Sequence, residues 1–211
     1  MLGANDGIVS TASLVLGVAA AGASSTAIVT AGTAGLVAGA LSMAAGEYVS
    51  VSSQRDSEDA DLRLEERELA GDPRGELREL AGIYERRGLS PDLALQVAVA
   101  LSGDGALAAH ARDELGLDEG RRARPLQAAW ASALSFSAGA ILPLVAIGVC
   151  PPPARAAVCV AVTLAALALL GDTGARLGGA PRLPATLRVL VWGTVAMAAT
   201  AGIGALVGAA V

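Results

Sequence analysis

Residues 7–46, GIVSTASLVLGVAAAGASSTAIVTAGTAGLVAGALSMAAG, form a run of 40 residues without one charged side chain. A helix that crosses a membrane needs about 20 apolar residues at a rise of 1.5 Å each. The run is therefore too long for one crossing and long enough for two. The polar stretch AGASST at 21–26 is the natural turn between them.

Three further apolar runs predict one crossing each. They lie at roughly 126–149, 155–171 and 187–209, separated by CPPPAR and by GDTGARLGGAPRLPATLR. The composition, 54% hydrophobic and 2% aromatic, is that of a membrane protein. We predict an all-α membrane protein with five transmembrane helices, whose two termini lie on opposite sides.

The basic residues, all of them arginine, predict the orientation. Arg121, Arg122 and Arg124 precede the third span, Arg176, Arg182 and Arg188 lie between the fourth and fifth, and only Arg155 falls on the other side. By the positive-inside rule the N-terminus is cytoplasmic and the C-terminus is outside or luminal. The predicted domains are 1–51 (spans one and two), 52–124 (a cytoplasmic helical insert) and 125–211 (spans three to five).

The first span and the two cysteines each have a simple interpretation. A cleaved signal peptide is the alternative for the first span, but no positively charged segment precedes LVLGVAAAGA, so we expect the span to be retained. Cys150 and Cys159 do not form a CxxC motif, and we expect them to pack as apolar side chains.

The insert, 52–124, is strongly acidic. It carries 17 of the 20 acidic residues and 11 of the 15 arginines, a net charge of −6, which suits cations and not nucleic acid. Its Gly and Pro residues predict four helices: about 53–70 ending at Gly71, one beginning at Asp72 and Pro73, one beginning at Ser90 and Pro91, and about 105–115 ending at Gly116.

Two pairs of glutamates stand out in the insert. Glu65 and Glu68 are three residues apart on one predicted helix, and Glu76 and Glu79 on the next, so each pair projects from one helical face. Solvated helices often carry such pairs with interleaved arginines, as here. The only histidine, His110, precedes Glu114 by four residues, a spacing that can share a transition metal, although a lone histidine is more often a plain surface residue.

The membrane part holds three candidate ligands. Asp6 shares a helical stripe with Ser10, and Gly35, Gly39, Met43 and Glu47 recur every four residues. An ionisable group beside a glycine-lined seam is a functional candidate, the alternatives being a helix cap for Asp6 and a membrane edge for Glu47. Carboxylates with a thioether suit Fe²⁺ or Mn²⁺, and in low dielectric a proton competes with the metal for them. That competition is the minimal mechanism of an antiporter.

Several stretches resemble the vacuolar iron transporter family. They are LGANDGIVSTASLVLGVAAAGAS (2–24), LVAGALSMAAGEYVSVSSQRDSE (36–58), ELAGIYERRGLSPDLALQVA (79–98) and LAAHARDELG (107–116), and the likeness continues through RLGGAP and GTVAMAATAGIGALVG. The resemblance implies a homodimer of five-span protomers in a lipid bilayer. It implies export of Fe²⁺, often Mn²⁺ too, from the cytosol in exchange for protons. The sequence does not rank Fe²⁺ against Mn²⁺, Co²⁺ or Zn²⁺, and we expect no prosthetic group.

The resemblance also implies roles for individual residues. Asp6 and Met43 match pore ligands, with Glu47 close by, and Glu65, Glu68, Glu76, Glu79 and Glu114 match metal ligands of the insert. Some family members carry methionines just before the last glutamate, where this sequence has AAHARDE, so His110 is the candidate replacement. The family usually has a polar stretch ahead of LGANDG, where this sequence has Met1 alone.

A bacterial cytoplasmic membrane is the preferred location, ahead of a vacuolar one. The rival function is a metal-sensing or scaffolding membrane protein without transport, which would have no need of Asp6. An enzyme, such as an intramembrane hydrolase, is not expected, because the spans hold no His and no Ser/Lys or paired-Asp arrangement.

Overall fold

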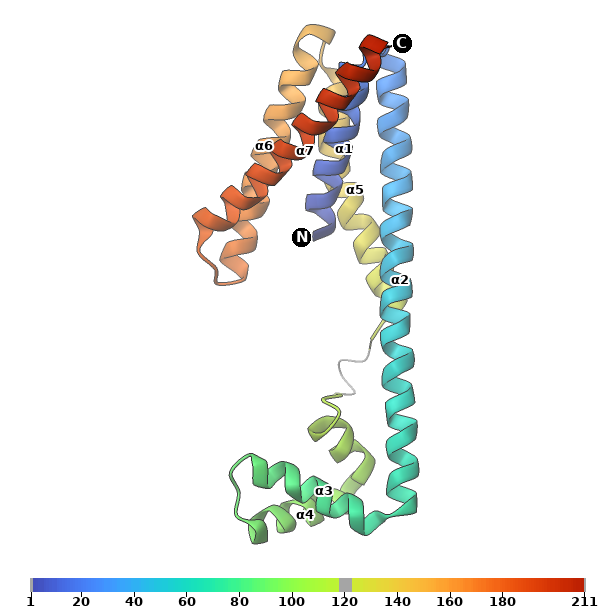
Figure 1. Ribbon diagram of the computed structural model, residues 1–211, viewed down its shortest axis with the longest axis vertical. Helices are drawn as coiled ribbons and strands as arrows, with labels where there is room; N and C mark the ends of the chain where they lie inside the picture. The colour runs from blue at the N-terminus through green and yellow to red at the C-terminus, as the bar shows by residue number, and fades with distance from the viewer. Residues whose placement is uncertain (1, 118–122, 211) are drawn as a thin grey trace. The chain divides into compact units, whose positions relative to one another are not determined.

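The computed structural model describes residues 2–117 and 123–210, and these are helical or connecting, with no strand in either range (Figure 1). In chain order the helices are α1 (Leu2–Ala20), α2 (Ser25–Gly71), α3 (Pro73–Arg86), α4 (Pro91–Asp113), α5 (Pro125–Val149), α6 (Pro152–Leu177) and α7 (Arg182–Ala210). The chain divides into two compact units: a membrane unit of Met1–Tyr48 with Leu126–Val211, and an insert unit of Val49–Pro125.

Five helices of the described residues, α1, α2, α5, α6 and α7, are long and apolar enough to cross a membrane. This confirms the predicted all-α fold with five spans. The predicted turn is also present, because α1 ends at Ala20, α2 begins at Ser25, and Gly22 between them has a φ of +79°. Arg121 and Arg122, which entered the orientation argument, lie outside the described residues.

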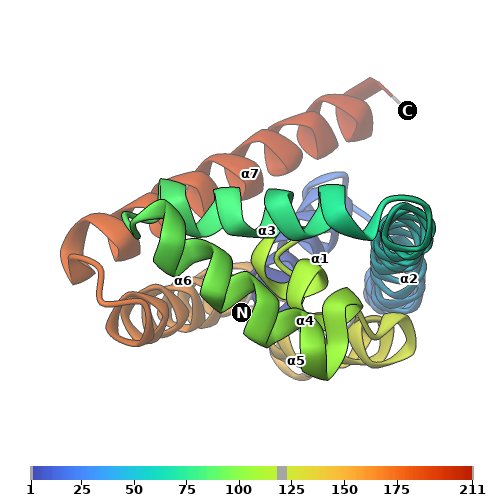
Figure 2. The same cartoon turned by 90° about the horizontal axis from the view of Figure 1, so that it is seen from below.

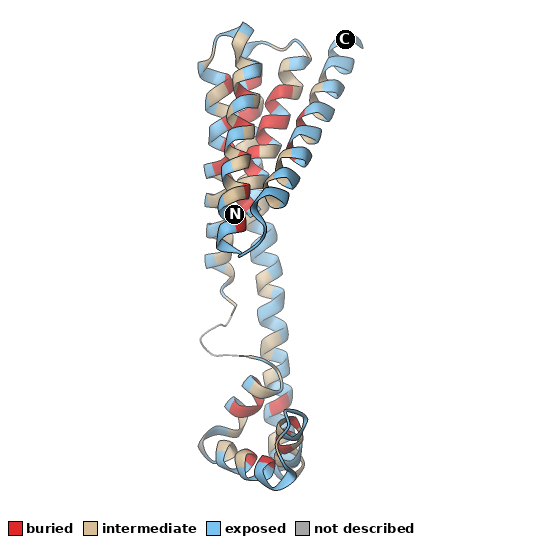
Figure 3. Ribbon diagram, turned by 90° about the vertical axis from the view of Figure 1, so that its left-hand side faces the viewer, coloured by how far each residue is buried: buried red, intermediate tan, exposed pale blue. Residues whose placement is uncertain are grey.

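The membrane unit is packed around α1, which contacts both α6 and α7. Figure 3 shows its buried residues on the facing sides of the helices, while many outer positions are exposed. The buried cluster consists of Ala12, Val15, Leu16, Ile28, Ile147, Cys159 and Met197. Glycines bring α1 and α5 into backbone contact: a Cβ on Gly7 would overlap the Phe136 carbonyl, and one on Gly139 would overlap the Ala4 carbonyl.

Two helices run further than their sequence predicted. The expected separate helix at 53–70 is instead the continuation of α2, which runs unbroken to Gly71. The reason is local, because residues 47–70 contain neither Gly nor Pro to end a helix. The expected helix at 105–115 is the last part of α4, set off from the rest by Gly105, whose φ of 155° and ψ of 82° are not helical.

The insert unit folds around the α3 and α4 pair, which lie side by side (Figure 2). Its core is formed by Leu80, Ala81, Ile83, Ala94, Ala98 and Ala109. Helix α3 begins as predicted: Pro73 is the first helical residue, and the Asp72 carboxylate accepts a hydrogen bond from the Gly75 N–H at 2.9 Å. Helix α4 begins at Pro91, as predicted, but Ser90 makes no side-chain capping bond to the described residues.

Candidate metal site

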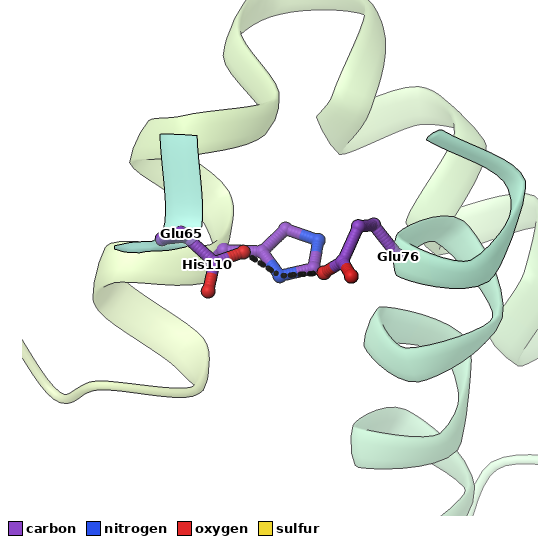
Figure 4. A group of neighbouring side chains, drawn as sticks. All are labelled: Glu65, Glu76 and His110. Carbon is purple, nitrogen blue, oxygen red and sulfur yellow. Dashed lines mark ion pairs between the residues drawn. The ribbon is translucent and has the colours of Figure 1, made fainter. Parts of the chain in front are cut away.

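Three glutamates from different parts of the insert unit converge on one nitrogen of His110. The Nδ1 atom of His110, on α4, lies 2.8 Å from Glu65 Oε1 on α2, 3.0 Å from Glu114 Oε2 at the end of α4, and 3.7 Å from Glu76 Oε2 on α3. Figure 4 shows Glu65 and Glu76 approaching the imidazole from separate helices. The candidate ligand atoms of Glu65, Glu76 and His110 all lie within 4.8 Å of one another.

The local folding of the chain explains this convergence. Only Asp72 separates α2 from α3, so the last turns of α2, with Glu65, and the first turn of α3, with Glu76, meet at one corner. The hydrogen bond from Gly75 to Asp72 fixes that first turn. The change of direction at Gly105 then brings the end of α4 to the same corner, with His110 and Glu114 one turn apart.

The centre of the cluster is buried and short of hydrogen-bond donors, while Glu114 at its edge has a side chain that is 29% exposed. The side chain of His110 is 0% exposed, that of Glu65 3% and that of Glu76 13%. Nδ1 can carry at most one proton and so can satisfy at most one acceptor, and the geometry of a hydrogen bond is met toward Glu114. Glu65 Oε1 is therefore buried without a hydrogen-bond partner among the described residues. A buried oxygen without a partner needs an explanation, and a role as a metal ligand would supply one.

The electrostatics of the cluster are those of crowded, partly desolvated carboxylates. Burial, joined by the negative charge of Glu114, raises the pKa of Glu65 to about 7, although His110 opposes the shift. Burial also raises the pKa of Glu76, with the charge of Glu79 as the next cause. A divalent cation at the centre of the cluster would neutralise these carboxylates and accept a lone pair from Nδ1.

A second set of contacts, which sequence reasoning missed, holds the end of α4 against α3. Asp113 accepts hydrogen bonds from Tyr84 Oη at 2.8 Å, from Arg87 Nη1 at 2.7 Å and from Arg112 Nη2 at 2.8 Å. Burial acts to raise the pKa of Asp113, but these hydrogen bonds outweigh it and lower the pKa to about 2. Asp113 precedes Glu114 directly, so the contact fixes the segment that carries the cluster. Tyr84 and Asp113 are 29 residues apart, and no sequence spacing signals their contact.

The remaining predicted insert ligands lie outside the cluster. Glu68 and Glu79 are exposed, one turn beyond Glu65 and Glu76 on the same helices. Their charges contribute to the raised pKa values of the buried pair. The structure therefore brings together Glu65, Glu76, His110 and Glu114 and leaves Glu68 and Glu79 on the surface.

The membrane unit has a cavity of its own, of about 220 Å³, with a mostly apolar lining that includes one carboxylate. Its lining consists of Asp6, Ser10, Thr11, Leu14, Gly35, Gly39, Ser42, Met43 and Phe136. Two of the three predicted pore residues, Asp6 and Met43, thus face the same cavity, whereas Glu47 is exposed and not part of the lining. Gly39 is required here because a Cβ on it would overlap the ring of Phe136.

These features define a class: an α-helical, multi-pass membrane protein with a group of side chains that could hold a metal ion. The chain belongs to the VIT family, whose model matches residues 1–205. This confirms the family resemblance seen in the sequence.

Curated relatives cover almost the whole chain. A protein of Acanthamoeba castellanii named vacuolar iron transporter is 44% identical over 208 residues, 98% of this chain and 76% of the relative. VIT-like transporter 1b of Glycine max is 38% identical over 99% of this chain and 75% of its own length. Vacuolar iron transporter homolog 5 of Oryza sativa is 41% identical over 96% of this chain and 76% of its own length.

Proposed function

We propose that this protein moves Fe²⁺, and also Mn²⁺, out of the cytosol in exchange for protons. Membership of a family whose relatives are named as iron transporters supports metal transport across a membrane. It also makes the chain a transporter and not an enzyme. The observation that carries the proposal is the convergence of three carboxylates on the buried Nδ1 of His110.

In the first step the insert unit captures metal from the cytosol. Its net charge of −6 attracts cations, and its buried cluster offers oxygen and nitrogen ligands at one point. The exposed Glu68 and Glu79 extend the negative field toward solvent and serve as entry ligands. The cytoplasmic placement of this unit rests on the positive-inside rule.

In the second step the metal passes through the membrane unit. The carboxylate of Asp6 and the thioether of Met43 face one cavity, and Glu47 lies one helical turn after Met43 on α2. Asp6 binds metal and proton by turns, so that release of one accompanies uptake of the other. A homodimer alternates the access of this cavity between the two sides of the membrane.

The relatives do not indicate in which membrane this protein lies. All three of those described above are eukaryotic, so they give no support to the sequence-based preference for a bacterial cytoplasmic membrane. Co²⁺ and Zn²⁺ are further candidate substrates because both accept carboxylate and imidazole ligands.

The second candidate function is metal sensing without transport. One observation favours it: the cluster lies wholly within an insert unit that has its own hydrophobic core. Metal binding there could reshape the unit without any ion crossing the membrane.

Metal uptake into proteoliposomes separates the two functions. The full-length protein is compared with Glu65→Gln/Glu76→Gln, which alters the buried pair, and with Glu68→Gln/Glu79→Gln, which removes the same charge from the exposed pair. We expect saturable Fe²⁺ uptake by the native protein. The Glu65→Gln/Glu76→Gln variant should need about tenfold more metal for half-maximal uptake. The Glu68→Gln/Glu79→Gln variant should show a much smaller increase in this concentration.

Two outcomes would contradict the proposal. No uptake by folded native protein would favour a sensor. Equal half-saturation for all three proteins would show that the buried cluster does not capture the transported metal.

A further inference from the structure

The insert cluster combines oxygen and nitrogen ligand atoms, and this combination affects which metal ions the site prefers. Glu65, Glu76 and Glu114 supply carboxylate oxygens, and His110 supplies the only nitrogen among the converging atoms. The ring presents Nδ1 to all three carboxylates. Its other nitrogen, Nε2, is buried and has no hydrogen-bond partner in the described part of the chain. Nδ1 is thus the ring atom placed to bind a metal at this point.

Oxygen and nitrogen donors rank metals differently. Carboxylates alone suit Mg²⁺, Ca²⁺ and Mn²⁺, which gain little from an imidazole. Imidazole favours Fe²⁺ and the later first-row ions, and affinity for such a site rises from Mn²⁺ through Fe²⁺ and Co²⁺. Replacing the nitrogen ligand by an oxygen ligand would reduce the differences in affinity among these ions.

We propose that His110 is the specificity-determining ligand of the insert site, whose Nδ1 makes the site prefer Fe²⁺ and later first-row ions to Mn²⁺, Mg²⁺ and Ca²⁺. The inference rests on the proposed function, in which this cluster captures the transported metal. Burial makes the choice strict, because a fully enclosed ring is held in one orientation and cannot be exchanged for a water ligand. Mn²⁺ is then a weaker substrate than Fe²⁺ at the capture step.

The sharpest test changes the donor atom and little else. In His110→Asn the side-chain amide can place an oxygen near the position of Nδ1. Full-length protein in detergent is titrated with Co²⁺, an air-stable stand-in for Fe²⁺, and with Mn²⁺. Glu66→Gln, an exposed carboxyl-to-amide change beside Glu65, is the control.

We expect the Kd for Co²⁺ to rise about tenfold in His110→Asn while the Kd for Mn²⁺ changes much less. The ratio of the Mn²⁺ Kd to the Co²⁺ Kd should therefore fall about tenfold. Glu66→Gln should keep the native ratio. An unchanged ratio in folded His110→Asn would overturn the inference and leave capture by the carboxylates intact.

A second measurement needs no folded variant. Pulsed electron paramagnetic resonance of Mn²⁺ bound to the native protein should show coupling to an imidazole nitrogen. Absence of this coupling from Mn²⁺ whose binding is lost in Glu65→Gln/Glu76→Gln would also overturn the role of His110 alone. Failure of the native protein to bind either Co²⁺ or Mn²⁺ would overturn both this inference and the capture step of the proposed function.

Discussion

Glu65 is the residue at which stability and the proposed function oppose each other. Burying its charged carboxylate destabilises the metal-free protein, whereas the proposed metal site uses that carboxylate as a ligand. Glu65 is buried, its Oε1 atom lacks a hydrogen-bond partner within the described residues, and its pKa is raised to about 7, first by burial and then by Glu114. Its ordinary pKa is 4.5. Between these values the folded protein holds a proton that the unfolded chain has lost, so the folded state loses stability as pH rises through this window. Above about pH 7 the full penalty is present.

Raising the pH should therefore destabilise the metal-free insert unit. Between about pH 5 and about pH 8 the free energy of local opening should fall by on the order of 2 kcal/mol, and Glu65→Gln should remove most of this dependence. Hydrogen exchange of the α4 amides around His110, corrected for the intrinsic effect of pH, measures it. Glu66→Gln should behave like the native protein, and a native insert that grows more stable over this range would contradict the assigned pKa.

At the same scale, the sequence predicted ligand types better than ligand positions. The spacing of Glu65 and Glu68 places both on one helical face, but which of them is buried depends on how α2 meets α3 and α4. That information is tertiary, and the structure buries Glu65 while exposing Glu68. His110 had only its spacing from Glu114 to support it, whereas its complete burial makes it the centre of the cluster.

At the scale of the element, the start of α3 positions Glu76 through one hydrogen bond. Asp72→Ala removes the acceptor for the Gly75 N–H and should cost about 1 kcal/mol of local stability. Metal affinity should fall a fewfold because Glu76 lies in the loosened first turn. Hydrogen exchange of α3 and metal titration of the full-length protein measure the two effects.

The matched control is Ser90→Ala at the start of α4. Ser90 occupies the equivalent position before Pro91 but makes no side-chain capping bond to the described residues. It should therefore change neither quantity. Equal effects of Asp72→Ala and Ser90→Ala would show that the hydrogen bond to Asp72 does not position Glu76.

Element boundaries were predictable wherever a residue enforces them. Pro73 and Pro91 mark helix starts that the structure retains, whereas α4 ends at Asp113, three residues before the predicted stop at Gly116. The continuity of the second span with the first insert segment, within α2, was not predicted. A change from apolar to charged residues alters the surroundings of a helix but does not end the helix. Without Gly or Pro in 47–70, the span and the first insert segment form one helix.

For the whole molecule, segregation of charge was enough to predict five spans, because lipid admits long apolar helices and few charges. Contacts between spans were less accessible. The approach of α1 to α5 depends on Gly7 and Gly139 being opposite a carbonyl of the other helix, which no one-dimensional pattern specifies. The homodimer and the orientation in the membrane stay predictions.

Proton coupling of the proposed transport depends on Asp6, the acidic residue that lines the membrane cavity. The most direct test is accumulation of Mn²⁺ in proteoliposomes against its own concentration gradient, driven only by an imposed pH gradient and followed with an internal pH dye. We predict accumulation with opposite proton movement in the native protein, collapse on adding a protonophore, and loss of both fluxes in Asp6→Asn but not in Glu66→Gln. Metal flux that does not depend on the pH gradient, or that persists unchanged in Asp6→Asn, would show that Asp6 does not couple metal transport to protons.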